Sequence, residues 1–145
     1  HFAVDIINVS NIAYVNQAGE IIREGNPPGD VVAAYEGTVI DHGFNNRYGW
    51  YIEIEHPMTD AVRDAYPNAQ KWSTYYAHLD KTTAVEPGTH VKANQFISSI
   101  SDSGKSTGPH LHFEVRVYRP SGRYNDGNIY YDKVNPYPEE KAANE

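Results

Sequence analysis

The sequence of 145 residues contains no cysteine. A disulfide framework is therefore excluded, and the redox state of the compartment is left open. No apolar run approaches the roughly 18 residues that a membrane-spanning helix needs, so we expect no membrane span. Helical patterns are also scarce. The best one covers Asp60 to Tyr66, with Thr59 as a candidate N-cap and Pro67 as the stop.

Positive charge is in deficit. Lys and Arg number 12 against 19 Asp and Glu, which gives a formal net charge of -7 and a pI near 5.4. Such a chain is not expected to bind nucleic acid or an anionic wall polymer by charge alone. The length fits one core, so we assign residues 1–138 to a single domain and 139–145 to a polar C-terminal tail, and we expect a monomer.

Short segments rich in β-branched and aromatic residues dominate the chain. They predict a mainly β fold with little helix: one small domain built on a twisted antiparallel sheet, with a groove walled by loops. A hairpin is expected where 11–15 and 20–23 flank a turn that contains Gly19. The other predicted strands are 31–34, 38–41, 49–56, 72–79, 96–100 and 110–118.

The run Pro-His-Leu-His-Phe-Glu-Val at 109–115 alternates between polar and apolar residues. Successive side chains of a strand point to opposite faces, so His110, His112 and Glu114 share one face. Leu111 and Phe113 share the other and would hold the strand against a core. Two imidazoles two residues apart can serve one metal site, one as a ligand and the other as an acid or base.

Two other segments supply polar partners for this pair. His1 and Asp5 lie on the same side of a second alternating run. Together with His112 they would make three protein ligands and leave a fourth position for water, as in catalytic zinc sites. His78, in the run Tyr-Tyr-Ala-His-Leu at 75–79, is the natural partner of His110 in proton chemistry.

The order of these segments resembles the lysostaphin and LytM family of zinc endopeptidases, which cut peptide bonds in bacterial peptidoglycan. The resemblance extends to about Val117. It rests on His1-x-x-x-Asp5, Tyr76-Ala77-His78-Leu79 and the run from Ser106 to Glu114. It implies Zn²⁺ bound by His1, Asp5 and His112, and two catalytic histidines, His78 and His110, that assist a zinc-bound water in attacking the scissile carbonyl.

The same resemblance implies peptidoglycan peptides as the substrate and a protein that is secreted, periplasmic or associated with the cell wall. No His-Glu-x-x-His motif is present, so the base is sought between His78 and His110, and the sequence leaves open which of them acts. We interpret His42, His56 and His90 as surface or satisfied core residues. Carboxylate partners for a ligating histidine are sought at Glu114 and Asp80.

Other functions remain open at this point. A free amine at His1 together with its imidazole would make a copper brace, which favours oxidative cleavage of a polysaccharide; Asp5 argues against it, because carboxylates suit harder ions. A polysaccharide lyase and a non-catalytic domain for cell-wall binding or regulation are the further alternatives. Segments 8–27 and 57–71 look inserted relative to the family, and we expect them to wall the substrate groove.

Overall fold

The computed structural model describes residues 4–7, 14–15, 21–22, 30–81, 85–101, 110–127 and 129–134. For residues 4–7, 14–15, 21–22, 110 and 126 it describes the backbone alone. The elements are β1 (Val4–Ile7), β2 (Tyr14–Val15), β3 (Ile21–Ile22), β4 (Asp30–Val32), β5 (Gly37–Asn45), β6 (Gly49–His56), α1 (Asp60–Ala65), β7 (Lys71–Leu79), β8 (His90–Val91), β9 (Phe96–Ser99), β10 (His110–Tyr118), β11 (Tyr124–Asp126) and β12 (Ile129–Val134).

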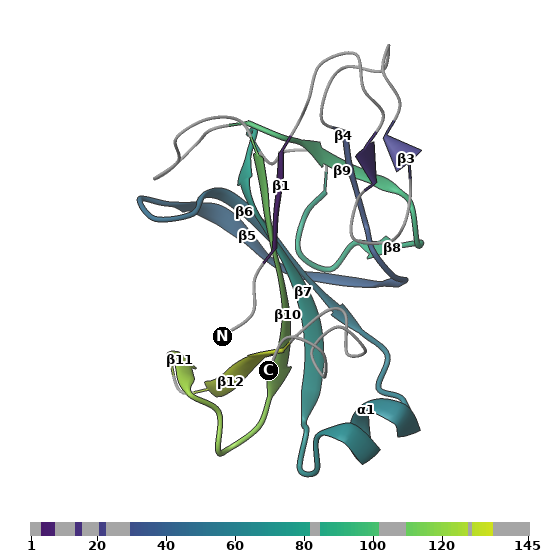
Figure 1. The fold of residues 1–145 in the computed structure, drawn as a ribbon, viewed down its shortest axis with the longest axis vertical. Helices are drawn as coiled ribbons and strands as arrows, with labels where there is room; N and C mark the ends of the chain where they lie inside the picture. Colours follow the sequence, from purple (N-terminus) through teal and green to yellow (C-terminus); the bar gives the residue numbers. More distant parts are fainter. Residues whose placement is uncertain are drawn as a thin grey trace.

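An antiparallel sheet of eight strands forms the body of the molecule (Figure 1). Its order is β11-β12-β10-β7-β6-β5-β8, and β1 is a further partner of β10. Strand β1 pairs with residues 110–113 of β10, whereas β12 pairs with residues 115–118. The two therefore divide one edge of β10 between them, while β7 lies along the other edge. The predicted mainly β, antiparallel fold is confirmed.

One face of this sheet packs the hydrophobic core. Leu111 and Phe113 of β10 lie there with Tyr76 of β7, as the alternation of the sequence predicts. Val31 of β4 and Ile97 of β9 belong to the same cluster, so the two-stranded β4–β9 sheet closes the core from the other side. Burial of each large apolar side chain contributes about 1.5–3 kcal/mol.

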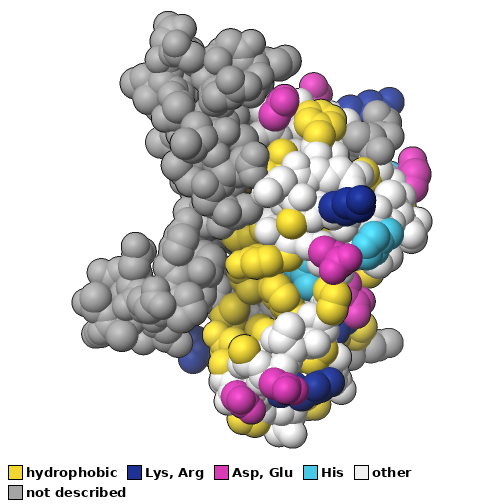
Figure 2. All heavy atoms as spheres, turned by 90° about the vertical axis from the view of Figure 1, so that its right-hand side faces the viewer, with side chains coloured by type: hydrophobic (Ala, Val, Ile, Leu, Met, Phe, Trp, Pro, Cys, Tyr) yellow, Lys and Arg dark blue, Asp and Glu magenta, His cyan; other side chains and the backbone are white. Residues whose placement is uncertain are grey.

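The predicted short elements are also found. Helix α1 begins after Thr59, whose hydroxyl accepts a hydrogen bond from the Val62 N–H at 3.2 Å, and it ends one residue before the predicted end at Tyr66. The predicted hairpin appears as the antiparallel pair β2 and β3. Within the described part of the chain, no helix is long and apolar enough to cross a membrane. On the face in Figure 2, Lys and Arg side chains are interspersed with Asp and Glu.

The expectation that segment 57–71 walls the substrate groove is wrong. This segment carries α1 and joins the end of β6 to the start of β7, where Lys71 lies opposite Tyr118. His112 lies opposite Ala77, six residues further along β7. At about 3.3 Å per residue the predicted active-site residues are therefore about 20 Å away along the strands. Figure 1 shows α1 at the far end of β7. Most of segment 8–27 lies outside the described residues.

A run of hydrogen bonds holds the buried side chain of His56. Nδ1 lies 2.7 Å from the carbonyl oxygen of Glu36, and Nε2 lies 2.7 Å from Thr74 Oγ1. The Thr74 hydroxyl in turn lies 2.8 Å from that of Tyr76, which accepts the Ala34 N–H at 2.8 Å. Burial lowers the pKa of His56, and the hydrogen bond to the Glu36 carbonyl opposes this only in part. His56 is thus the satisfied core histidine that the sequence analysis expected.

We expect His56 to make folding stability depend on pH. Because its pKa is lower in the folded state, the unfolded chain takes up the proton first. The contribution of His56 is complete above the unfolded pKa of about 6.5 and is lost as the pH falls toward the folded value. Urea unfolding at pH 7.5 and 5.5 should show a smaller difference for His56→Gln than for the wild type. An equal difference would contradict this assignment.

Candidate metal and proton-transfer site

The face of the sheet opposite the core is polar around β10. His112, Glu114 and Arg116 lie on it, in alternation with the core residues. Residues directly opposite each other in antiparallel strands share a face. Tyr75 of β7 is opposite Glu114, and Lys133 of β12 is opposite Arg116. Four strands thus contribute to one polar surface once Glu53 of β6, opposite Tyr75, is included.

Strand β1 brings Asp5 to His112. Asp5 and His112 are direct register partners, and Ile7 is opposite His110. Cβ atoms of opposite residues in an antiparallel pair are about 4.5–5.5 Å apart, which is the spacing that two ligands of one metal need. His1 lies outside the described residues. Among the described side chains no three His, Cys, Asp or Glu residues converge on a metal position, but those of Asp5 and His110 are not among them.

His78 reaches this face because of a bulge in β7. Strict alternation from Tyr76, which lies in the core, would place His78 on the core side as well. Opposite β6, the register of β7 advances from Tyr76 to Leu79 while β6 advances only from Ile52 to Trp50. One extra residue is therefore accommodated in β7, and such bulges redirect side chains.

The backbone at the bulge is held in an unusual conformation. His78 has φ of 58°, in the left-handed region that non-glycine residues rarely adopt. Its N–H donates to the Tyr48 carbonyl at 2.7 Å, and its carbonyl accepts the Ser101 N–H at 2.9 Å. The imidazole is buried and meets the ring of His112 edge-on, with 5.9 Å between the ring centroids. The structure thus brings the rings of His78 and His112 together through a bulge that the periodicity of the sequence does not show.

Glu114 holds one ring nitrogen of His112. The Nε2–H of His112 donates to Glu114 Oε2 at 2.7 Å, since an ionised carboxylate only accepts hydrogen bonds. The other oxygen, Oε1, accepts the Nε–H of Arg116 at 2.9 Å, and Lys133 Nζ lies 3.5 Å from Oε2. Burial alone would raise the pKa of Glu114, but the hydrogen bond from His112 and the charges of Arg116 and Lys133 outweigh it and lower the pKa to about 2.

Tyrosines extend the surface away from His112. The Tyr48 ring lies 5.2 Å from that of His112 and 5.3 Å from that of Tyr75, which stacks on Tyr51 at 5.3 Å. Burial and the nearby charge of Glu114 raise the pKa of Tyr48. A pocket of about 180 Å³ opens here. Its lining consists of Asp41, Asn45, Tyr48, Tyr51, Tyr75, Arg116, Asn125 and Tyr131.

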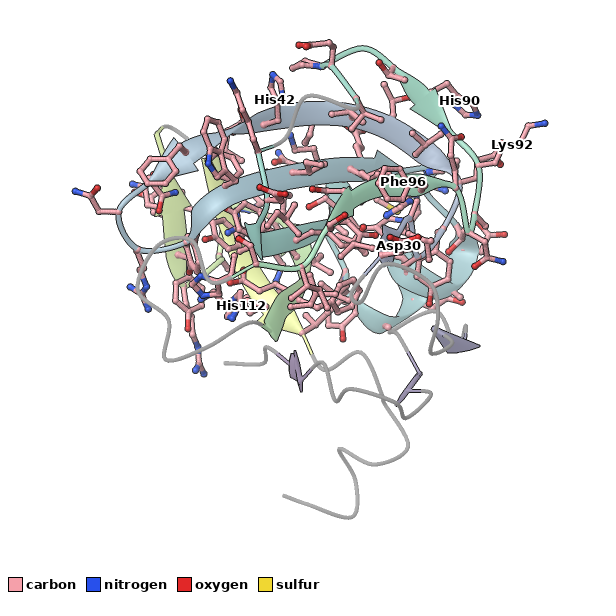
Figure 3. The ribbon with its side chains drawn as sticks, turned by 90° about the horizontal axis from the view of Figure 1, so that it is seen from above. Asp30, His42, His90, Lys92, Phe96 and His112 are labelled. Atoms are coloured by element: carbon pink, nitrogen blue, oxygen red, sulfur yellow. The ribbon has the colours of Figure 1, made fainter. Side chains whose placement is uncertain are left out.

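Other residues considered from the sequence lie elsewhere. Figure 3 shows His42 and His90 at the edge of the sheet formed by β5 and β8, away from His112. They contact the surface carboxylates of Glu86 and Glu36, both at 3.2 Å, as expected of surface histidines. Asp80 is exposed and accepts the Lys81 N–H, so of the two expected carboxylate partners only Glu114 reaches His112.

Both the sequence and the β fold of this chain are similar to those of known peptidases. The model of peptidase family M23 matches residues 21–129. This stretch contains His78, His110 and His112 but begins after His1 and Asp5. Because the match covers most of the sequence, the chain belongs to peptidase family M23.

Individual relatives agree with this membership. The peptidoglycan DD-endopeptidase ShyB of Vibrio cholerae is 50% identical over 87 residues, which are 60% of this chain and 17% of ShyB. A putative glycyl-glycine endopeptidase LytM from Ruminococcus gnavus aligns with a TM-score of 0.55 and 30% identity over 81% of this chain and 43% of that one. The catalytic domain of lysostaphin from Staphylococcus simulans shares the fold, with a TM-score of 0.58 at 24% identity over 97% and 79% of the two chains.

The chain spans only about a fifth of the length of the curated relatives that it matches, since the aligned part is 17% of ShyC and 18% of Mpg. ShyC is a peptidoglycan DD-endopeptidase of Vibrio cholerae, and Mpg is a DD-carboxypeptidase/endopeptidase of Neisseria meningitidis. Because the chain covers only this part of its relatives, its membership in peptidase family M23 assigns to it a peptidase domain.

We expect Glu114→Ala to destabilise the protein by about 3–5 kcal/mol, because it leaves the buried charges of Arg116 and Lys133 without their shared carboxylate. Glu86→Ala is the matched control. It removes an exposed carboxylate that faces His42, and the expected loss is below about 1 kcal/mol. Urea unfolding of both variants measures the difference. Equal losses would mean that the buried carboxylate has no special part in the fold.

Proposed function

We propose that this chain is a zinc-dependent endopeptidase that hydrolyses peptide cross-links of bacterial peptidoglycan. The observation that carries the proposal is the register of β1 on β10, which puts Asp5 opposite His112, next to the redirected His78. Membership in peptidase family M23 and the relatives named as peptidoglycan endopeptidases support the substrate class. Such a substrate requires a protein that is secreted, periplasmic or associated with the cell wall.

The donor set fits zinc. We assign His1, Asp5 and His112 as its ligands, because imidazole nitrogen and carboxylate oxygen are donors that zinc accepts and three protein ligands leave a position for water. A ligating histidine usually donates its other ring N–H to a carboxylate. The bond from His112 Nε2 to Glu114 fits this pattern, so Nδ1 is the proposed ligating atom. When bound, zinc polarises a carbonyl and lowers the pKa of a coordinated water.

His78 and His110 are the proposed catalytic residues. Imidazole is the side chain that exchanges protons near neutral pH. One ring accepts the proton of the attacking water, and a ring returns a proton to the nitrogen of the leaving amine. The buried ring of His78 beside His112 suits this work, because its backbone is held from both sides by Tyr48 and Ser101.

The metal assignment separates ligands from catalytic residues. We expect one zinc per chain in the wild type, and loss of zinc in Asp5→Ala and His112→Ala. His78→Ala and His110→Ala should keep the metal and lose about 100- to 10,000-fold in turnover. Elemental analysis together with peptidase assays tests both halves. An empty site in His78→Ala would show that the roles are assigned wrongly.

The bond cleaved can be read from the products. Purified sacculi treated with the zinc-loaded chain should release new free amines without new reducing ends or ultraviolet absorbance from unsaturated sugars. Unsaturated sugars without amines would instead identify a lyase, and copper-dependent oxidised sugars would identify the brace. If zinc is bound but no wall preparation yields any product, the endopeptidase proposal is overturned in favour of a binding domain.

A further inference from the structure

The cluster of charged side chains behind His112 has more members than the single carboxylate partner that a histidine ligand usually has. Glu114 is fully buried, and Glu53 and Arg116 are nearly so, at 2% and 4% exposed. Arg116 Nη1 lies 3.8 Å from Glu53 Oε1, whereas its Nε lies 2.9 Å from Glu114 Oε1. Glu53 in turn accepts hydrogen bonds from Ser73 and Tyr118. Replacing such buried ion pairs by apolar residues is often neutral or stabilising, so stability alone does not explain the cluster.

Arg116 contacts two aromatic rings in addition to its carboxylate partners. Its Cζ atom lies 3.8 Å from the ring centroid of Tyr75 and 4.3 Å from that of Tyr131. The guanidinium therefore packs against two aromatic rings while its Nε–H points at Glu114. Because the guanidinium is planar and its donors are fixed relative to one another, restraining its plane also restrains the carboxylate that it binds.

We propose that Arg116 is a positioning residue for the metal ligand His112 and that it acts through Glu114. This inference rests on the proposed zinc peptidase function. With Oε1 of Glu114 bound to Arg116, Oε2 is left to accept the Nε2–H of His112 at 2.7 Å. The ring is thereby kept in one tautomer and one orientation before any metal arrives. Such outer partners of histidine ligands typically change metal affinity by about 10- to 100-fold.

The test is zinc affinity of the folded chain, measured by competition with a chelator. Arg116→Lys keeps the charge but loses the Nε–H and the guanidinium contact with the two rings, and we expect about 10- to 100-fold weaker zinc binding, on the scale known for such partners. The absorption spectrum of the cobalt(II)-loaded variant should shift as well. Glu53→Gln is the matched control, because Glu53 is equally buried and lies 3.8 Å from Arg116, whereas the carboxylate that binds His112 is that of Glu114. Its zinc affinity should stay within a few-fold of the wild type.

Two additional variants test the role of Arg116 without relying on Arg116→Lys alone. Tyr131→Leu keeps every charge of the cluster, so it allows the test if Arg116→Lys does not fold, and we expect weaker zinc binding here too. In a Glu114→Gln background, Arg116→Lys should weaken zinc binding little further, because the route through Glu114 is already cut. Additive losses in this double variant would overturn the route.

Other outcomes are equally decisive. Arg116 also lines the tyrosine pocket, so a raised KM with unchanged zinc affinity and cobalt spectrum would make it a substrate-binding residue and overturn the proposal. A folded Arg116→Lys chain with wild-type zinc affinity would overturn this inference while leaving the peptidase function intact. A wild-type chain that binds no zinc would overturn both.

Discussion

The buried carboxylate of Glu114 is the interaction on which the functional face depends. A carboxylate without partners would be protonated at this depth, because burial disfavours its charge. Two of its three partners, His112 and Arg116, come from β10 itself, and the third, Lys133, comes from β12, so the full set of partners forms only when β10 and β12 are in register. The orientation of His112 and the pairing of β10 with β12 are thus coupled through the ionised carboxylate of Glu114.

The site combines this rigid cluster with two features of the backbone. The register of β1 sets Asp5 opposite His112, and the bulge in β7 turns His78 away from the core. A shift of β1 by a single residue would move Asp5 to the other face of the sheet, because side chains alternate with a period of two. Precise strand pairing, rather than a loop, therefore determines whether the residues can cooperate.

The sequence predicts the strands and the helix well where periodicity and turn chemistry agree, as for β6, β10 and α1. It also identifies His112 and Glu114, since both lie on one alternating run. It misses β11 and β12, although Asp126 and Gly127 are typical of a hairpin turn. The partners Glu53 and Lys133 come from distant strands, so only register shows them. The face of His78 depends on a bulge, which no simple alternation reveals. The roles of all five proposed site residues, which are His1, Asp5, His78, His110 and His112, stay predictions.

The central claim is that Asp5 and His112 bind one zinc ion. X-ray absorption at the zinc edge of the loaded chain tests it most directly, because it reports the atoms that surround the metal. We expect a four-coordinate site with imidazole nitrogens and carboxylate oxygen at about 2.0–2.2 Å from the metal. If the His112→Ala variant retains any zinc, its spectrum should show scattering from fewer imidazole rings than that of the wild type. A spectrum without imidazole scattering, or one that His112→Ala leaves unchanged, would contradict the account.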